Sequence, residues 1–137
     1  MEAAAESTEI WVLGWSAVLV IAHILAQALS LDLSGDLSTK YLLGPRDEQR
    51  VSKSVVAGRL MRSLNNMLET YPVFIGLALA LAVTGKTGDL GEVGAVVWIV
   101  ARVGYTILYV TGVPVLRSIV WFVSIAGLVL MVVRLMT

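Results

Sequence analysis

Four long apolar runs, separated by polar segments, dominate the order of hydrophobic and polar positions along this chain. They cover residues 10–31, 54–84, 93–111 and 114–136. About 20 helical residues cross a bilayer core, so each run is long enough to span a membrane. Aliphatic runs of this length satisfy their backbone hydrogen bonds as helices rather than as alternating strands of about ten residues. The pattern therefore predicts an all-α integral membrane protein with four transmembrane helices.

The polar segments predict how these helices are connected. Residues 85–92 (GKTGDLGE) and 111–114 (TGVP) are short and carry turn residues, which places consecutive helices antiparallel. The connection from Asp32 to Lys53 is longer and is broken at Gly44-Pro45. No internal repeat is visible. We expect a single domain, residues 1–137, built as a four-helix antiparallel bundle.

Composition supports the membrane assignment and excludes several functions. The chain is 58% hydrophobic and only 15% charged, whereas a soluble domain is near half apolar and about a quarter charged. Its net charge of zero offers no basic surface for nucleic acid. With no cysteine and one histidine, it has neither a disulfide framework nor the ligands of a thiolate or histidine-rich metal site. We therefore expect no metal and no nucleic-acid partner.

Lysine and arginine predict the orientation in the membrane. The N-terminal segment MEAAAESTEI is acidic, so we expect the first run to be retained rather than cleaved as a signal peptide. By the positive-inside rule the side richer in lysine and arginine is cytoplasmic, which puts both termini outside, in the periplasm if the membrane is a bacterial inner membrane. Lys40, Arg46, Arg50, Lys53 and Arg117 lie on the cytoplasmic side of this arrangement, and Lys86 and Arg134 on the other.

Polar residues recur at helical spacing inside the apolar runs. At about 100° per residue, residues three and four apart share one face of a helix. Each set lies in the cytoplasmic half of its helix, so we expect the four sets to meet at one depth. The sets are His23, Gln27 and Ser30 on the first helix, Arg59, Arg62, Asn66 and Glu69 on the second, Arg102, Tyr105 and Tyr109 on the third, and Arg117, Trp121 and Ser124 on the fourth.

These buried charges allow a structural and a functional interpretation. An arginine at mid-bilayer costs about 3 kcal/mol on insertion scales, so such groups face the bundle interior and pair. In the structural interpretation Glu69 neutralises Arg62 or Arg59, and Arg102 is held by a tyrosine and carbonyls. In the functional one, arginines outnumber the single acid and bind an anionic ligand or lipid headgroups. A ligand with several carboxylates and one ammonium suits the set, because arginine forks bind carboxylates and Glu69 can accept an ammonium.

Other aromatic and polar residues receive more limited interpretations. Trp11, Trp15 and Trp98 are expected to anchor the outer membrane boundary, where tryptophan is enriched. The roles of His23, Arg59 and Trp121 stay open at this stage.

Taken together, the polar motifs resemble the MAPEG family, the membrane-associated proteins in eicosanoid and glutathione metabolism. In RSLNNMLETYP, Arg62, Asn66 and Glu69 match the family's arginine, asparagine and glutamate. The resemblance covers essentially the whole chain, and the LLGPRDE connection is similar to the bacterial branch. In RVGYTILYVTGVPVLRS, the residues in corresponding places are Arg102, Tyr105, Tyr109, Pro114, Arg117 and Ser118.

The resemblance implies a homotrimer that binds glutathione between neighbouring subunits near the cytoplasmic face. It implies a glutathione transferase-like or peroxidase-like enzyme, whose lipophilic electrophiles enter from the membrane lipids. Arg117 then activates the sulfur as a catalytic residue, and Ser118 corresponds to a serine implicated in the prostaglandin synthase branch. The residues expected to bind glutathione are Arg62, Asn66, Glu69, Arg102, Tyr105 and Tyr109.

The sequence also departs from the family, which keeps alternatives open. Leu64 stands where some members have His or Gln, Thr70 replaces an aromatic residue, and Trp121 replaces a tyrosine near the entrance for a lipophilic substrate. One alternative is a non-catalytic protein of the same fold that binds anionic lipid or another thiol. A proton or ion carrier is a third hypothesis, although a single buried acid supplies few groups that could pass protons across the membrane.

Overall fold

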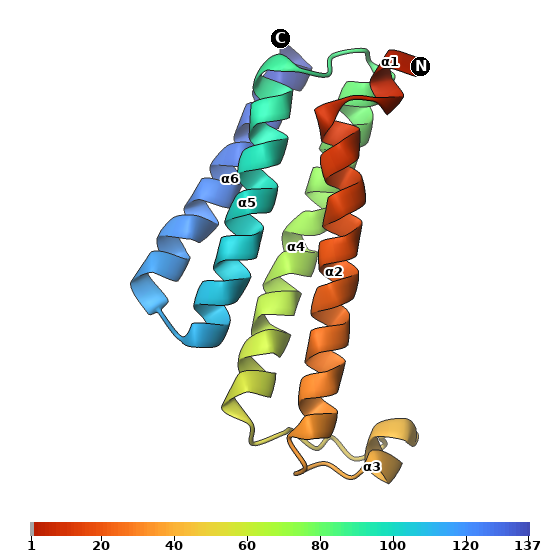
Figure 1. The fold of residues 1–137 in the computed structure, drawn as a ribbon, viewed down its shortest axis with the longest axis vertical. Helices are drawn as coiled ribbons and strands as arrows, with labels where there is room; N and C mark the ends of the chain where they lie inside the picture. Colours follow the sequence, from red (N-terminus) through yellow and green to blue (C-terminus); the bar gives the residue numbers. More distant parts are fainter. Residues whose placement is uncertain (1) are drawn as a thin grey trace.

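A computed structural model describes residues 2–137 and places them in four long and two short helices (Figure 1). Each long helix is sufficiently long and apolar to cross a membrane. The predicted all-helical integral membrane protein with four spanning helices is therefore confirmed. The helices are α1 (Glu2–Ala5), α2 (Thr8–Leu33), α3 (Thr39–Leu43), α4 (Val55–Val83), α5 (Asp89–Thr111) and α6 (Pro114–Met136).

The four long helices lie side by side and alternate in direction, as the short connections predicted. Both termini lie at one end of the bundle, which we call the terminal end (Figure 1). The segment 34–54, with α3, lies at the opposite end, which we call the connection end. Helix α4 contacts α2, α5 and α6, so its side chains can take part in sites on either side of it.

The helix ends follow local capping chemistry. Serines precede three of the helices, and the hydroxyls of Ser7, Ser38 and Ser54 each accept a backbone N–H from the first turn of α2, α3 and α4. Helix α5 begins at Asp89, earlier than the predicted position 93, and the acidic residues of its first turn suit the positive end of a helix dipole. Helix α3 was not predicted; it ends at Leu43 and is followed by the capping residue Gly44 and by Pro45.

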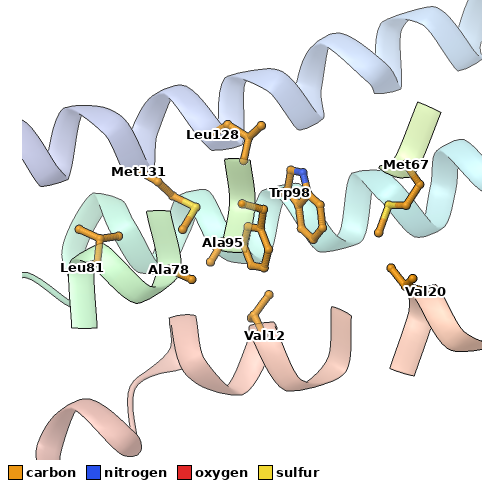
Figure 2. Close-up of a cluster of buried hydrophobic side chains, with 10 residues drawn as sticks. Val12, Val20, Met67, Ala78, Leu81, Ala95, Trp98, Leu128 and Met131 are labelled. Carbon is orange, nitrogen blue, oxygen red and sulfur yellow. The ribbon is translucent and has the colours of Figure 1, made fainter. Parts of the chain in front are cut away.

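The interior of the bundle is centred on Trp98 (Figure 2). Its ring is fully buried and stacks on Phe74, with centroids 3.9 Å apart and planes 3° from parallel. The prediction that Trp98 anchors the membrane boundary is therefore wrong. Trp98 shares a face of α5 with the buried residues Ala95 and Arg102, and that face points into the bundle.

The buried face of α2 is unusually polar. It carries four polar residues among six, while isoleucine and leucine residues such as Ile21, Leu25 and Leu29 point outward. This inverts the pattern of a soluble helix, because lipid tails solvate leucine as well as a protein interior does, whereas polar groups need protein partners. The buried residues are Glu9, Val12, Ser16, Val20, His23 and Gln27.

Helices α5 and α6 approach closely through two glycines. A Cβ atom added to Gly94 would lie 2.5 Å from the carbonyl oxygen of Gly127. Small residues at such crossings let two backbones pack directly in a membrane. This contact fixes α6 against α5 and so helps to set the geometry of the residues nearer the connection end.

Candidate functional site

Three of the predicted polar sets surround one pocket between α4, α5 and α6, toward the connection end. Its volume is about 270 Å³. Five of the predicted site residues line it, together with the aromatic rings of Trp121 and Phe122. The five are Asn66, Tyr105, Tyr109, Arg117 and Ser118.

Tyr109 contacts two arginines that come from different helices. The guanidinium carbon of Arg117, on α6, lies 4.4 Å from the centre of the Tyr109 ring. From α4, Arg62 donates through Nε to the Tyr109 hydroxyl over 3.3 Å. Tyr105 packs its ring edge-to-face against the same ring, with centroids 5.5 Å apart. The site thus gathers two positive charges around one aromatic side chain at the edge of the pocket.

Arg102 lies behind the pocket rather than in its lining. Its side chain is 1% exposed, and it donates from Nη1 to Oδ1 of Asn66 over 2.7 Å and from Nη2 to Oγ1 of Thr70 over 2.5 Å. Its guanidinium also lies 5.6 Å from the Tyr105 ring centre. The structural interpretation predicted a tyrosine and carbonyls as its partners. Tyr105 is such a partner through its ring, whereas the hydrogen bonds go to a side-chain amide and a hydroxyl rather than to backbone carbonyls. With Oδ1 engaged, Asn66 can offer a ligand its amide N–H groups.

Glu69 forms no ion pair with any arginine of the cluster. Within residues 2–137, ion pairs join Arg50 to Glu48 and Arg134 to Asp89, at opposite ends of the bundle. Glu69 is exposed on α4. The interpretation in which Glu69 neutralises a neighbouring arginine is therefore wrong for the single chain.

Arg59 contacts the turn that joins α5 to α6. Its Nη1 donates to the carbonyl of Val110 over 3.0 Å, in the last turn of α5, where a cation is favourable. Its guanidinium packs on Gly112, which has φ +83° and closes α5 in the left-handed conformation. The open question about Arg59 is thus answered structurally, because this side chain ties α4 to the turn that precedes Arg117.

The polar set of the first helix lies elsewhere. His23 and Gln27 are buried on the α2 face that packs against the bundle, and neither lines the pocket. Ser30 donates to the carbonyl of Gln27 over 2.7 Å. A single chain therefore brings together members of three of the four predicted sets, while Ser124 of the fourth helix donates to the carbonyl of Trp121 and does not line the pocket.

Sequence reasoning missed the positioning contact of Thr70 and the burial of Glu9. Thr70 follows Asn66 by four residues, so the same helical spacing that selected Asn66 could have selected it. Glu9 is fully buried at the terminal end, where its Oε1 accepts the N–H of Gly88 over 2.7 Å at the start of α5. Its spacing to Val12 and Ser16 places it on the buried stripe of α2.

These features define a class: a four-helix integral membrane protein with arginines and tyrosines gathered around a pocket inside its spans. The model of the MAPEG family matches residues 11–137, and the chain belongs to this family. Members of the family are largely glutathione-dependent membrane enzymes and are typically trimeric. No curated protein and no solved structure matches the chain.

Proposed function

We propose that this protein is a glutathione-dependent membrane enzyme, a transferase or peroxidase that acts on lipophilic electrophiles. The observation that carries the proposal is the placement of Arg62 and Arg117 around Tyr109, with neither arginine in an ion pair among residues 2–137. Charged groups inside a membrane-spanning bundle normally pair with opposite charges, so an anionic ligand would stabilise these two cations. Family membership makes glutathione the first candidate.

The charges of the site fit glutathione, which carries two carboxylates and one ammonium. Arg62 offers a guanidinium to a carboxylate, and the unpaired Glu69 offers an acceptor to the ammonium. Asn66 presents amide N–H groups to a peptide carbonyl, because Arg102 occupies its oxygen. Arg102 would then act on the ligand by positioning Asn66.

Arg117 is the residue we assign to sulfur activation. Bound glutathione supplies a thiol, whose pKa in water is about 8.5 and falls beside a cation. Arg117 reaches the pocket from the first turn of α6. Ser118 lines the same pocket beside it, and its hydroxyl donates to the carbonyl of Pro114 over 3.2 Å. A lowered thiol pKa gives the nucleophilic thiolate at neutral pH.

A lipophilic second substrate fits the outer edge of this pocket. Phe122 lines the pocket and is 67% exposed on the face of α6 that meets lipid. Trp121 lies edge-to-face against it, and its buried indole N–H has no hydrogen-bond partner among the described residues. An electrophile entering from the bilayer would therefore meet aromatic surface before it reached Arg117.

A homotrimer is the assembly we propose. Glu69 is exposed near the middle of the spanning helix α4 in the single chain, and a charge that faces lipid at the helix centre costs about 3 kcal/mol on insertion scales. Packing that face against a second copy removes this cost and would complete the ligand site. The lysine and arginine distribution supports a cytoplasmic connection end and periplasmic termini in a bacterial inner membrane.

The test is glutathione-dependent conjugation of a chlorinated nitrobenzene by the purified protein in detergent. We expect Arg117→Ala to lose conjugation and to keep the thermal shift that glutathione produces. Lys40→Ala, which removes a cation on α3 outside the pocket lining, should keep both. Unchanged turnover in Arg117→Ala would overturn the assignment. A thermal shift with anionic lipid but none with glutathione would favour a non-catalytic lipid-binding protein.

A further inference from the structure

A second cavity, of about 330 Å³, lies at the connection end between the last turns of α2, the segment 34–54 and the first turns of α4. It shares no lining residue with the pocket around Tyr109. We propose that this cavity binds the anionic headgroup of a phospholipid. The inference goes beyond the proposed enzymatic function and rests on Arg46 and Arg50, because Arg62, which also lines the cavity, is the residue that we assign to a carboxylate of glutathione.

Three arginines give the cavity its charge. Arg46, Arg50 and Arg62 line it, and its lining contains no aspartate or glutamate. Arg46 is oriented by two hydrogen bonds to the carbonyl of Leu42, from Nε over 3.0 Å and from Nη2 over 2.6 Å, which leave Nη1 for a ligand. Because these contacts hold the guanidinium in place, less side-chain entropy is lost when an anion binds.

Arg50 is also held in position, from two sides. Its Nη2 lies 3.0 Å from the carboxylate of Glu48, and its guanidinium carbon lies 5.2 Å from the centre of the Tyr41 ring. The tyrosine in turn accepts the backbone N–H of Arg50 and donates to the carbonyl of Glu48. Tyr41 therefore fixes both the backbone and the guanidinium of Arg50 at the wall of the cavity.

Gln27 supplies an independent observation that points to a ligand. It lines the cavity from α2, is 8% exposed, and its Nε2 has no hydrogen-bond partner among the described residues. A buried amide donor without a partner is costly. After a rotamer change that turns this amide into the cavity, a phosphate or ester oxygen there would accept from it.

The remaining walls select a lipid over a small anion. They are mostly apolar, and one of the lining side chains, Val51, is 86% exposed. Basic and apolar residues combined at the end of a spanning helix are typical of segments that lie against anionic leaflets. An acyl chain would cover the apolar side chains while the arginines hold the phosphate. The apolar lining residues are Leu31, Leu37, Leu42, Val51, Ala57 and Met61.

The test titrates phosphatidylglycerol and phosphatidylcholine onto the purified protein and counts bound lipid by native mass spectrometry. We expect a preference for phosphatidylglycerol that Arg46→Gln and Arg50→Gln each weaken about tenfold, the loss of a charged hydrogen bond. Lys53→Gln is the matched control, since it removes one charge from the same connection outside the cavity lining. Equal weakening by Lys53→Gln would mean diffuse attraction to the leaflet and would overturn the proposal.

A second variant separates ligand binding from structure. Gln27→Leu removes the unpartnered amide, so we expect unchanged or higher thermal stability together with a weaker preference for phosphatidylglycerol. Competition experiments with small soluble anions identify the source of the anion. Inorganic phosphate or sulfate that displaces phosphatidylglycerol at equal concentration would show that the cavity takes a small soluble anion and would contradict the lipid assignment. If neither anion displaces phosphatidylglycerol, the lipid assignment is supported.

Discussion

Arg102 donates from Nη1 to Oδ1 of Asn66 over 2.7 Å, so a fully buried cation on α5 is held by an amide on α4. The contact joins two helices inside the membrane and fixes the orientation of a residue that lines the pocket. It explains how the chain accommodates Arg102 without a carboxylate. It also leaves Glu69 without an ion pair in the described part of the chain and available to a ligand or a second subunit.

Replacing Asn66 tests this contact. Asn66→Leu removes one hydrogen-bond acceptor from the buried Arg102 guanidinium. This loss should lower the free energy of unfolding by about 1.5–3 kcal/mol. Asn65→Leu is the matched control, because the neighbouring asparagine is exposed and makes no such contact. Thermal unfolding in one detergent compares the two variants. Equal stability of both would show that the Asn66–Arg102 hydrogen bond contributes nothing.

The turn between α5 and α6 gives a second prediction. Gly112 has φ +83°, and a Cβ there would lie 2.7 Å from Nη1 of Arg59. Gly112→Ala should destabilise the protein by about 1–2 kcal/mol from the left-handed conformation alone, with the clash adding to it. Gly76→Ala is the control, since a Cβ on that helical glycine meets nothing within 4 Å.

A double-mutant cycle separates the clash from the backbone conformation. In an Arg59→Ala background the clash is absent, so Gly112→Ala should cost less there than in the wild-type background. The measurement is the thermal unfolding of the four proteins. Strictly additive effects would argue against a direct contact between Arg59 and Gly112.

Glu9 gives a third prediction, at the terminal end. Its buried carboxylate accepts the Gly88 N–H over 2.7 Å and so caps α5 from a different helix. Glu9→Leu removes this acceptor and should cost about 1 kcal/mol, as the loss of a helix cap does. Glu6→Leu makes the same change at an exposed position and should cost less. Chemical denaturation in detergent measures both, and a Glu9→Leu protein as stable as wild type would refute the capping role.

Asp36 gives a prediction about pH. Hydrogen bonds from the Ser34 hydroxyl and the Lys53 backbone N–H hold the pKa of the Asp36 carboxyl below its ordinary value of 3.8. Its carboxylate also accepts the Ser52 hydroxyl, so it joins the two ends of the connection. Because the folded pKa is depressed, this stabilisation is present above the unfolded pKa and is lost as pH falls through the folded pKa.

The measurement is amide hydrogen exchange of residues 34–54. We expect protection of the Lys53 amide to fall as pH drops below 3.8, after correction for the intrinsic exchange rate. Asp36→Asn should lower protection at neutral pH, whereas Asp47→Asn, an exposed change in the same connection, should not. Protection that is identical in all three proteins would contradict the role of Asp36.

The fold was largely predictable from the sequence because only a few backbone structures can span a membrane. The length of the apolar runs specified four spanning helices, and polar residues such as Asn66 and Arg102 had to point away from lipid. The meeting of α4, α5 and α6 around Tyr109 follows from the same constraint, since polar side chains inside a span need protein partners.

The partners of individual residues were harder to predict. Helical spacing gives the face that His23 and Gln27 share, but the rotation of α2 in the bundle decides which neighbour that face meets. Trp98 was assigned to the boundary by residue type, although its spacing with Ala95 and Arg102 places it in the core. The environment of Glu69 depends on what covers α4, and a single chain does not contain that information.

The most direct test of the account is whether bound glutathione is a thiolate at neutral pH. The ultraviolet absorbance of the thiolate, recorded as glutathione is added to the purified protein, measures this. We predict a thiolate band with the wild-type protein, and glutathione binding without that band in Arg117→Ala, because the cation that lowers the thiol pKa is gone. A band that survives unchanged in Arg117→Ala, or wild-type protein that does not bind glutathione, would contradict it.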